Sequence, residues 1–475
     1  MSFCAEEKSV AEMDARERSL YIDRHTPKGG LYTEAQRAVH PDSNSSWRVS
    51  PEPWWLPEPV VQHLKALGRH LHRFYRALNL LYSQSTRGIQ PAWVAAYLDQ
   101  GKTEEVIKFG RMNRFKGHLP YVIRPDVIPV RGGMVATELD SIPGGIGFTA
   151  SLGERYGSLG YDIVGGSNGM VNGFMGMIRS VAGMEDPVLG IVISEESSGY
   201  RPEMQYLGKA LQAAGLETYV VSPDEVVFTE SGLFVEDRKL DVVYRFFELF
   251  DLRNLPKIDL ILYAIRKGLV KVSPPMKAYP EEKMMMALYQ HPLLQSFWGE
   301  HLGKDTVAFL DKTFPKTWIL DPAPLPPFGV IPGLEINGQQ FSDWRALGNL
   351  GQKHRQLVIK PSGFSDQAWG SRGVSIGHDM AERDWQAVIE QALSEFATTP
   401  HILQEFHNGT LFDVSYYDFE TDRMLSFKGR VRLQPYYFVM DDEPVLSGVQ
   451  ATICPADKKV LHGMVDAVVV PCGVK

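Results

Sequence analysis

The sequence predicts an α/β protein, with α+β character overall, and three features support that fold class. The stretches 121–147 and 357–377 each contain two short β-prone runs that flank glycines, which is typical of a β-hairpin. Residues 188–272 alternate apolar strand-like runs with helical segments, which is the pattern of a small parallel α/β unit. With 475 residues, 44% of them hydrophobic, the chain is long enough for two or three domains with sizeable cores.

Charge and cysteine content exclude several classes of partner. The net charge is −8 and no block of five like charges occurs, so we expect neither a nucleic acid nor a membrane as partner. No apolar run approaches the roughly 18 residues of a membrane-spanning helix. Cys4, Cys454 and Cys472 are too scattered for a disulfide framework or a cysteine-based zinc site, which fits a reducing interior. We therefore expect a cytoplasmic protein that acts on small molecules, with its oligomeric state left open.

The N-terminal part of the chain is predicted to be extended and then helical. Residues 1–58 contain prolines and show little periodicity, so we expect them to wrap the surface of another domain. Apolar side chains from Val60 to Leu81 recur at steps of three and four, which predicts an amphipathic helix, and Pro91 begins a second helix. The basic residues that lie off this apolar stripe are interpreted as a solvated face; they are Lys65, Arg69, Arg73 and Arg76.

Three acidic residues and an arginine are predicted to meet on the first hairpin. Two short strands are joined by a turn at 131–133, so Glu138 and Asp140 share one strand face and Asp126 lies where the paired strand begins. Carboxylates gathered beside Arg124 repel one another unless a hard dication lies among them. Oxygen ligands without His or Cys favour Mg²⁺ or Mn²⁺. The alternative is a polar hairpin edge with unrelated surface acids.

A glycine-rich segment, 158–176, precedes the α/β unit. Its glycines follow no phosphate-loop spacing, so a loop that enters a helix over 168–181 is favoured over a phosphate site. The unit lacks Gly-x-Gly-x-x-Gly after its first strand, and dinucleotide binding is therefore not supported. Strands are expected over 188–194, 218–221, 241–246 and 269–272, and helices over 202–214 and 258–267.

The second hairpin combines a lysine with a glycine-rich loop. An apolar strand ends in Lys360, and Gly363, Gly370 and Gly373 lie between it and the next strand. A lysine at the end of a buried strand fixes an ammonium group, and a glycine loop can bring backbone N–H groups against an anion. This combination suits a polyphosphate. The alternative is an ordinary hairpin with a long loop and a solvated lysine.

Further candidates flank this hairpin. Lys283 begins a mostly helical segment and is either a ligand of phosphate or one more surface lysine, while the proline-rich stretch 322–332 is a linker or an extended cover. A helix is expected over 384–396, followed by a short strand over 401–406 with a carboxylate near its end. Alternate cations on a later strand mark either a wet sheet edge or a face toward phosphates; they are Lys428, Arg430 and Arg432.

Together, Lys283, the Lys360 glycine hairpin and the run Gln404-Glu405-Phe406 resemble the nucleotide-binding half of an ATP-grasp ligase. The acidic hairpin precedes that half, an order that resembles the circularly permuted branch typified by glutathionylspermidine synthetase. The family pattern there is Arg-x-Asp, then an acidic residue and an amide two positions apart. This sequence matches it with Arg124, Asp126, Glu138 and Asp140, although Asp140 stands where the family has asparagine and adds one negative charge.

The resemblance implies a circularly permuted ATP-grasp fold with a small parallel α/β (pre-grasp) unit between its two halves. It also implies a division of the chain into four parts. These are an N-terminal helical and extended region (1–117), the metal-site half (118–186), the parallel α/β domain (187–275) and the nucleotide-binding half (276–475).

The resemblance further implies an ATP-dependent carboxylate–amine ligase that forms an amide through an acyl phosphate. The substrates remain open among peptides, amino acids and polyamines. Mg²⁺ or Mn²⁺ would be held by Asp126, Glu138 and Asp140. The nucleotide would be bound by Lys283, Lys360, Gly363, Gly370, Gly373, Gln404 and Glu405, with Glu405 on the ribose. Catalytic roles fall to Arg124, at the charge growing on the γ-phosphoryl group, and to Arg430, at a substrate carboxylate or a phosphate.

Two other functions are compatible with the same motifs. One is a non-catalytic ATP-binding module that regulates a partner, and the other is an ATP-dependent phosphotransferase. The presence of all three acids together with Arg124 argues against the regulatory module, because binding alone needs no arginine at the γ-phosphoryl group.

Overall fold

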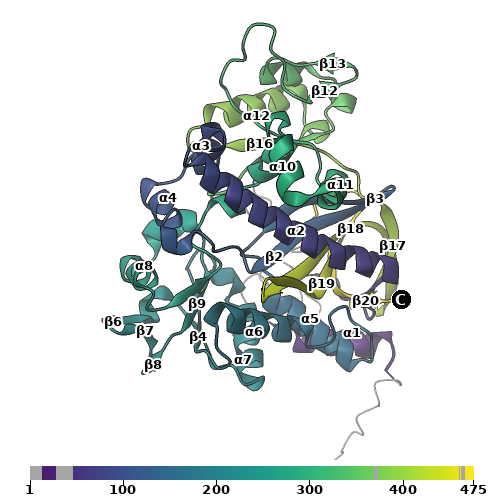
Figure 1. Cartoon of the computed structure of the whole chain (residues 1–475). Helices are drawn as coiled ribbons and strands as arrows, with labels where there is room; N and C mark the ends of the chain where they lie inside the picture. Colours follow the sequence, from purple (N-terminus) through teal and green to yellow (C-terminus); the bar gives the residue numbers. More distant parts are fainter. Residues whose placement is uncertain (1–12, 28–46, 369–372, 459, 462–465) are drawn as a thin grey trace, which may run out of the picture.

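The computed structural model describes residues 13–27, 47–368, 373–458, 460–461 and 466–475, and this part contains three larger β-sheets with helices packed around them (Figure 1). The mixed α/β composition agrees with the predicted fold class. None of the described helices is both long and apolar enough to cross a membrane.

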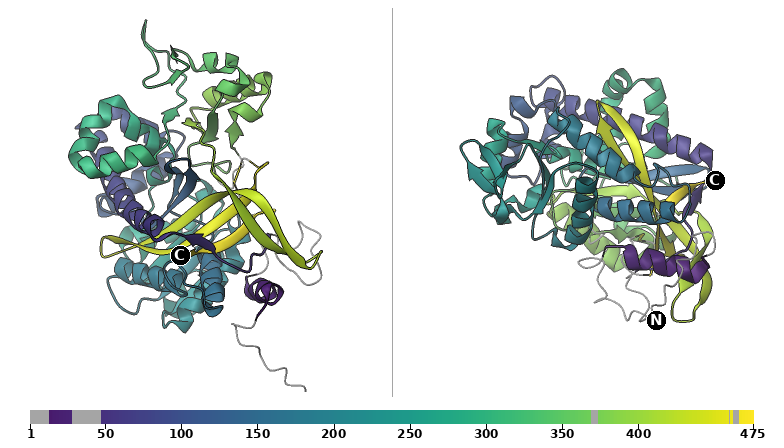
Figure 2. Two further views of the ribbon diagram at one scale, coloured as in Figure 1. Left: turned by 90° about the vertical axis from the view of Figure 1, so that its right-hand side faces the viewer. Right: turned by 90° about the horizontal axis from the view of Figure 1, so that it is seen from below.

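The largest sheet has seven strands and carries the acidic hairpin. Its two long strands, β18 (Arg423–Met440) and β19 (Glu443–Pro455), form the antiparallel centre that Figure 2 shows from the side. The first half of β18 pairs with β17 (Leu411–Asp418), and its second half pairs with β2 (Val122–Val130). The sheet continues through β3 (Gly133–Asp140) on one side, and through β20 (Val468–Val474) and the parallel β1 (Trp54–Leu56) on the other.

Helices cover both faces of this sheet. The predicted amphipathic helix is confirmed as α2 (Glu58–Ser85), which crosses one face. Gly68 allows close contact there, because a Cβ at this position would lie 2.4 Å from the ring of Tyr437. On the other face lie α5 (Ile146–Ser158) and α6 (Gly169–Ala182). α6 also packs against the second sheet and so joins the two.

The second sheet is the predicted parallel unit. Its strand order is β10 (Lys271–Ser273), β9 (Val242–Phe246), β4 (Leu189–Ile193) and β5 (Thr218–Val221), and every pair in it is parallel. The expected helices are confirmed as α7 (Arg201–Ala213) and α8 (Ile258–Lys267). A small antiparallel sheet is attached to this unit and consists of β6 (Val227–Thr229), β7 (Gly232–Val235) and β8 (Arg238–Lys239).

The third sheet carries Lys360. It consists of β11 (Thr317–Ile319), β16 (His401–Glu405), β14 (Leu357–Pro361) and β15 (Ser375–Ile376), all antiparallel. With α12 (Glu382–Ser394) it forms a lobe at the top of Figure 1, capped by β12 (Glu335–Ile336) and β13 (Gln339–Gln340). The remaining α-helices are α1 (Ala15–His25), α3 (Ala92–Asp99), α4 (Glu104–Gly110), α9 (Met284–Gln290), α10 (Gln295–Leu302) and α11 (Lys304–Thr313).

Several elements differ from the sequence prediction. The segment 1–58 contains α1, which begins with an Asp14–Glu17 capping box, and β1, which adds a strand to the largest sheet. α5 was not predicted. Glycines before α6 and at its first position allow close packing, because a Cβ on Gly165 or Gly169 would lie 2.2 or 2.4 Å from the carbonyl oxygen of Ser447. The four-part division of the chain stays a prediction.

Candidate functional site

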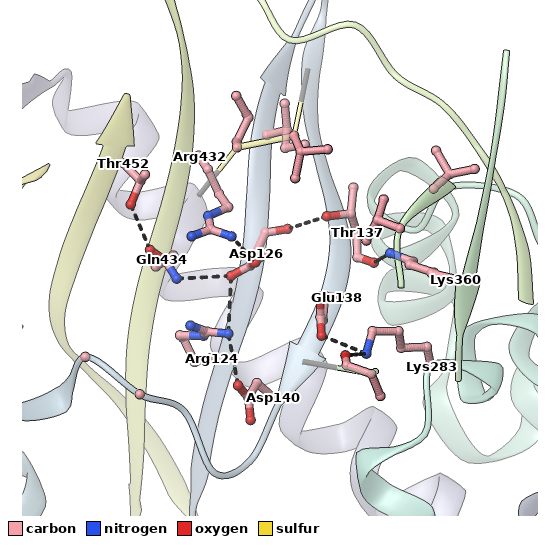
Figure 3. A pocket seen from close by; sticks show the side chains of 18 of the residues that line it. Arg124, Asp126, Thr137, Glu138, Asp140, Lys283, Lys360, Arg432, Gln434 and Thr452 are labelled. Carbon is pink, nitrogen blue, oxygen red and sulfur yellow. Dashed lines mark hydrogen bonds and ion pairs between the residues drawn. The ribbon is translucent and has the colours of Figure 1, made fainter. Parts of the chain in front are cut away.

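A cavity of about 340 Å³ lies where the three sheets approach one another, within the size range of ligand sites, about 300–1,000 Å³. The large sheet contributes the side chains of its acidic hairpin, and the third sheet contributes Lys360 (Figure 3). Glu405 of the third sheet also lines the cavity. Lys283 enters just before α9, and Glu248 comes from the end of β9. The cavity therefore gathers chain segments that are far apart in the sequence.

The register of the acidic hairpin brings its four predicted site residues together. Arg124 on β2 lies opposite Asp140 on β3, and Asp126 lies opposite Glu138. Residues two apart on one strand share a face, so all four side chains point to the same side of the hairpin. A register shift between Asp126 and Val127 marks the end of this run.

Arg124 lies between two of the carboxylates. One guanidinium nitrogen is 3.0 Å from Oδ2 of Asp140 and 3.5 Å from Oδ1 of Asp126, as Figure 3 shows. Asp140 also accepts a hydrogen bond of 2.9 Å from the backbone N–H of Ile142. Burial nevertheless raises the pKa of Asp140, and repulsion from Glu138 adds to this shift.

Asp126 is the most heavily bonded of the three acids. Arg432 donates to its Oδ2 at 2.9 Å and Gln434 donates to its Oδ1 at 3.3 Å. Burial opposes ionisation, yet Arg124 and Arg432 together lower the pKa of Asp126, so this buried group is ionised. From the sequence, Arg432 was one of three alternating cations on either a wet edge or a phosphate-facing strand, and it was not named among the site residues.

The three alternating cations of β18 have different surroundings. Arg430 lines the cavity and donates to the carbonyl of Ala456. Lys428 lies 3.1 Å from Asp413 with 67% of its side chain exposed, so at this position the wet-edge interpretation is correct. Only Arg432 bonds an acid of the hairpin.

The two predicted phosphate lysines face the hairpin from the opposite wall. Lys283 Nζ lies 2.9 Å from Oε1 of Glu138 and donates to the carbonyl of Ala368 at 2.8 Å. Lys360 Nζ donates to the carbonyl of Thr137 at 2.9 Å. Both are buried, but Glu138 outweighs burial and raises the pKa of Lys283, whereas burial lowers the pKa of Lys360 to about 8.

The strand predicted to bind nucleotide is β16, and its residues Gln404 and Glu405 line the cavity. The amide of Gln404 is buried and donates to Oγ1 of Thr317 at 3.1 Å. Glu405 is half-buried, with one oxygen 3.5 Å from Nε2 of His407, and this contact lowers the pKa of Glu405. Glu405 is therefore the residue of the pair with a side chain open to a ligand.

The glycines of the Lys360 loop are not part of the described cavity wall. A Cβ on Gly363 would lie 2.9 Å from the carbonyl oxygen of Glu281, and one on Gly373 would lie 2.7 Å from the ring of Pro361. Both positions thus need glycine for close packing within the loop. Gly370 lies outside the described residues, and a phosphate role for the three glycines stays a prediction.

Glu248 lines the cavity and was not found from the sequence. Burial, with repulsion from Glu281, raises the pKa of Glu248 to about 8. It follows a strand of the parallel sheet, and the carboxyl ends of such strands are where α/β folds bind ligands. A carboxylate two residues after the strand was therefore a usable signal.

The chemistry of the hairpin fits a hard dication. Within the described residues, no group of three or more His, Cys, Asp or Glu side chains is already arranged around one point as a metal site. However, the carboxylates of Asp126 and Asp140 already share one positive charge, that of Arg124, within 3.5 Å. Oxygen donors placed this way suit Mg²⁺ or Mn²⁺.

Comparisons with known proteins agree with the architecture. The structure is similar to that of a glutathione synthetase-like effector (GSS30) from Globodera pallida in its apo form, with a TM-score of 0.55, 11% identity and 98% of both chains covered. At this identity the similarity shows a shared fold alone. A protein from Methylobacillus flagellatus, provisionally assigned as a gamma-glutamylcysteine synthetase, gives a TM-score of 0.41 at 12% identity over 83% of this chain and 87% of that chain, which carries no argument. No protein-family model and no curated protein matches the sequence.

Proposed function

We propose that this protein is an ATP-dependent carboxylate–amine ligase of the ATP-grasp type, in the circularly permuted order typified by glutathionylspermidine synthetase. One observation carries the proposal. Two buried lysines from different parts of the chain, Lys283 and Lys360, face one hairpin that presents an arginine and three carboxylates across a single cavity. The fold shared with a glutathione synthetase-like effector supports it.

Unused donors in the cavity support an anionic ligand. The Nε atoms of Arg124 and Arg432 are buried and have no hydrogen-bond partner among the described residues. Buried donors without partners are rare in folded proteins, because each costs about 1–3 kcal/mol. Phosphate oxygens of ATP would satisfy them, and guanidinium groups match phosphate geometry well.

In the proposed mechanism, the protein mainly positions and neutralises charge. Asp126, Glu138 and Asp140 would hold Mg²⁺ or Mn²⁺, which when bound offsets the negative charge of the β- and γ-phosphates. Lys283 and Lys360 would bind the α- and β-phosphates, and Glu405 the ribose hydroxyls. Lys283 would exchange its present partner, the carboxylate of Glu138, for a phosphate oxygen. Lys360 would likewise exchange the carbonyl of Thr137.

Two chemical steps follow. A substrate carboxylate oxygen attacks the γ-phosphorus, the bond to the β-phosphate oxygen breaks, and ADP leaves with an acyl phosphate remaining. Arg124 would stabilise charge that grows on the transferring group, and Arg430 would orient the carboxylate. The amine then attacks the acyl carbon, inorganic phosphate leaves, and the nitrogen loses a proton to give the amide.

The test is a screen of amino acids, short peptides and polyamines, in pairs of carboxylate and amine, for stimulated ADP release. The proposal expects release that depends on both partners, and it expects hydroxylamine in place of the amine to trap the acyl phosphate as a hydroxamate. ADP release with one hydroxyl acceptor and no amine would instead identify a phosphotransferase. Tight ATP binding without turnover for any pair would identify a regulatory module.

A further inference from the structure

One carboxyl group of the cavity wall has no ion pair or hydrogen bond among the described residues. Each of the other four carboxylates that line the cavity has a basic nitrogen within reach: Asp126 at 2.9 Å, Glu138 at 2.9 Å, Asp140 at 3.0 Å and Glu405 at 3.5 Å. Glu248 has no such contact, although Arg245 and Lys283 partly offset the effect of burial and of Glu281 on its pKa. A partly buried carboxyl group without a direct partner is costly to ionise, so its presence calls for an explanation.

A structural role for Glu248 is not supported by its contacts. It occupies the N-cap position of the short 3₁₀ helix Leu249–Asn254, but its side chain makes no capping hydrogen bond. Arg245, on the strand that precedes Glu248, is fully buried and already bonded to other groups. Arg245 donates to the carbonyls of Phe247, Pro274 and Pro275 and pairs with Glu281.

Glu248 shares the cavity wall with other residues that follow strands of the parallel sheet. Ser197 and Tyr200 follow β4, and Phe246 ends β9, so this part of the wall comes from the carboxyl edge of that sheet. The rings of Tyr200 and Phe246 contact each other edge to face, with centroids 5.6 Å apart. Gly144 leaves room for this wall, because a Cβ there would lie 2.2 Å from the ring of Tyr200.

A carboxylate beside aromatic rings is the chemistry that recognises a cation. The carboxylate supplies an ion pair, and the rings supply cation–π attraction to an ammonium group. Arg124, Arg432, Lys283 and Lys360 line the same cavity. A ligand that fills the cavity can therefore meet these cations with anionic groups and Glu248 with a cationic group.

We propose that Glu248 binds a primary ammonium group of the amine substrate, flanked by Tyr200 and Phe246. That this ligand is a substrate rests on the ligase function proposed above, whereas ammonium binding at Glu248 does not. Glu248 is thus a specificity-determining residue that selects cationic over neutral ligands of the same shape.

The test measures binding without nucleotide. Two ammonium probes, 1,4-diaminobutane and glycinamide, and one neutral isostere, 1,4-butanediol, are titrated by calorimetry into wild type, Glu248→Gln, Glu248→Asp and Glu230→Gln. Glu230 is an exposed acid in the turn between β6 and β7, so its substitution makes the same charge change away from the cavity. Thermal unfolding of each variant checks that it is folded.

We expect at least one ammonium probe to bind wild type and Glu230→Gln equally, with affinity at least tenfold lower in Glu248→Gln and an intermediate value in Glu248→Asp. The diol should not bind. Equal affinity of wild type and Glu248→Gln, or no binding of either ammonium probe to wild type, overturns the proposal. Probe binding with no amine-dependent ADP release would leave this inference standing and remove the ligase function. Amine-dependent ADP release, together with equal probe affinity in wild type and Glu248→Gln, would support the ligase function and overturn this inference.

Discussion

The acidic hairpin and the parallel sheet contribute carboxylates to the cavity that differ in their pairing. On the hairpin, cations and carboxylates neutralise one another: Arg432 pairs with Asp126, Arg124 with Asp140 and Lys283 with Glu138. Glu248, which follows β9 of the parallel sheet, has no ion pair or hydrogen bond among the described residues. A ligand at the hairpin must replace existing ion pairs, whereas a cationic ligand at Glu248 adds one.

This difference suggests how a site of the proposed kind could stay folded without its nucleotide and metal. Three carboxylates packed together would repel one another strongly, but the side-chain cations stand in for the charge of a dication. In the proposed function, a dication would pair with the carboxylates and phosphate oxygens would pair with the released lysines and arginines.

Glu138→Gln should have the largest effect at the hairpin. The change keeps the shape but removes the partner of Lys283 and one full ligand charge for the metal. We expect turnover to fall roughly a thousandfold, several kcal/mol of transition-state stabilisation, with only partial rescue by high Mg²⁺. Steady-state ADP release over a Mg²⁺ series measures this, and complete rescue would show that Glu138 is not a ligand.

Arg124→Ala should separate catalysis from binding. If Arg124 acts on charge that grows during phosphoryl transfer, turnover should fall by about 2–4 kcal/mol of transition-state stabilisation while ATP affinity changes much less. The hydroxamate assay should then accumulate product far more slowly than wild type. A variant that turns over like wild type would mean that the Arg-x-Asp match of the sequence is coincidental.

Much of the fold could be predicted from local pattern. The strand over 218–221 and the helix over 258–267 match β5 and α8 to the residue, because apolar periodicity and the flanking Gly215 and Gly268 define them. α5 was missed because its buried face is made of glycine, threonine and serine as well as apolar residues. β1 was missed because three residues show no periodicity, and its pairing with β20 depends on tertiary contact.

The candidate site was predictable where it follows strand alternation and not where it depends on packing between sheets. The register of the hairpin places Asp126 and Glu138 opposite each other, as alternation implies. The hydrogen bond from Arg432 to Asp126 joins two strands, and the two residues are 306 positions apart in the sequence. No local sequence pattern could therefore predict it. Glu248 likewise enters the cavity only because the parallel unit docks beside the hairpin.

Lys360→Ala tests whether the third sheet holds phosphate. Lys360 is buried, and its ammonium group donates to a backbone carbonyl rather than to a carboxylate. Its positive charge is therefore available to pair with a phosphate. We expect a loss of about 1.5–3 kcal/mol in ATP affinity, the scale of a charge-assisted hydrogen bond, with an unchanged circular dichroism spectrum. The ATP affinity of wild type should also fall above pH about 8, where Lys360 loses its charge, and that decline should be absent in the variant. Unchanged affinity would place the phosphates elsewhere.

Glu248→Gln should have the smallest effect, and this effect is on stability. Loss of a paired acid lowers the free energy of unfolding, whereas loss of Glu248 should raise it. The pKa of Glu248 is raised to about 8 in the folded protein by burial and by Glu281, while an unfolded glutamate titrates near 4.3. The folded state therefore binds more protons between these values, and wild-type stability falls as pH rises from about 4 to 8.

At pH 5 the variant and wild type should unfold almost alike. At pH 9 the variant should be more stable by about 1–2 kcal/mol, the low part of the range for a buried group without a partner, since Glu248 keeps some contact with solvent. Denaturant unfolding across pH measures this, with Glu230→Gln as the control that should follow wild type. Parallel curves for Glu248→Gln and wild type would mean that Glu248 already has a partner in solution, and the contrast between Glu248 and the paired carboxylates of the hairpin would disappear.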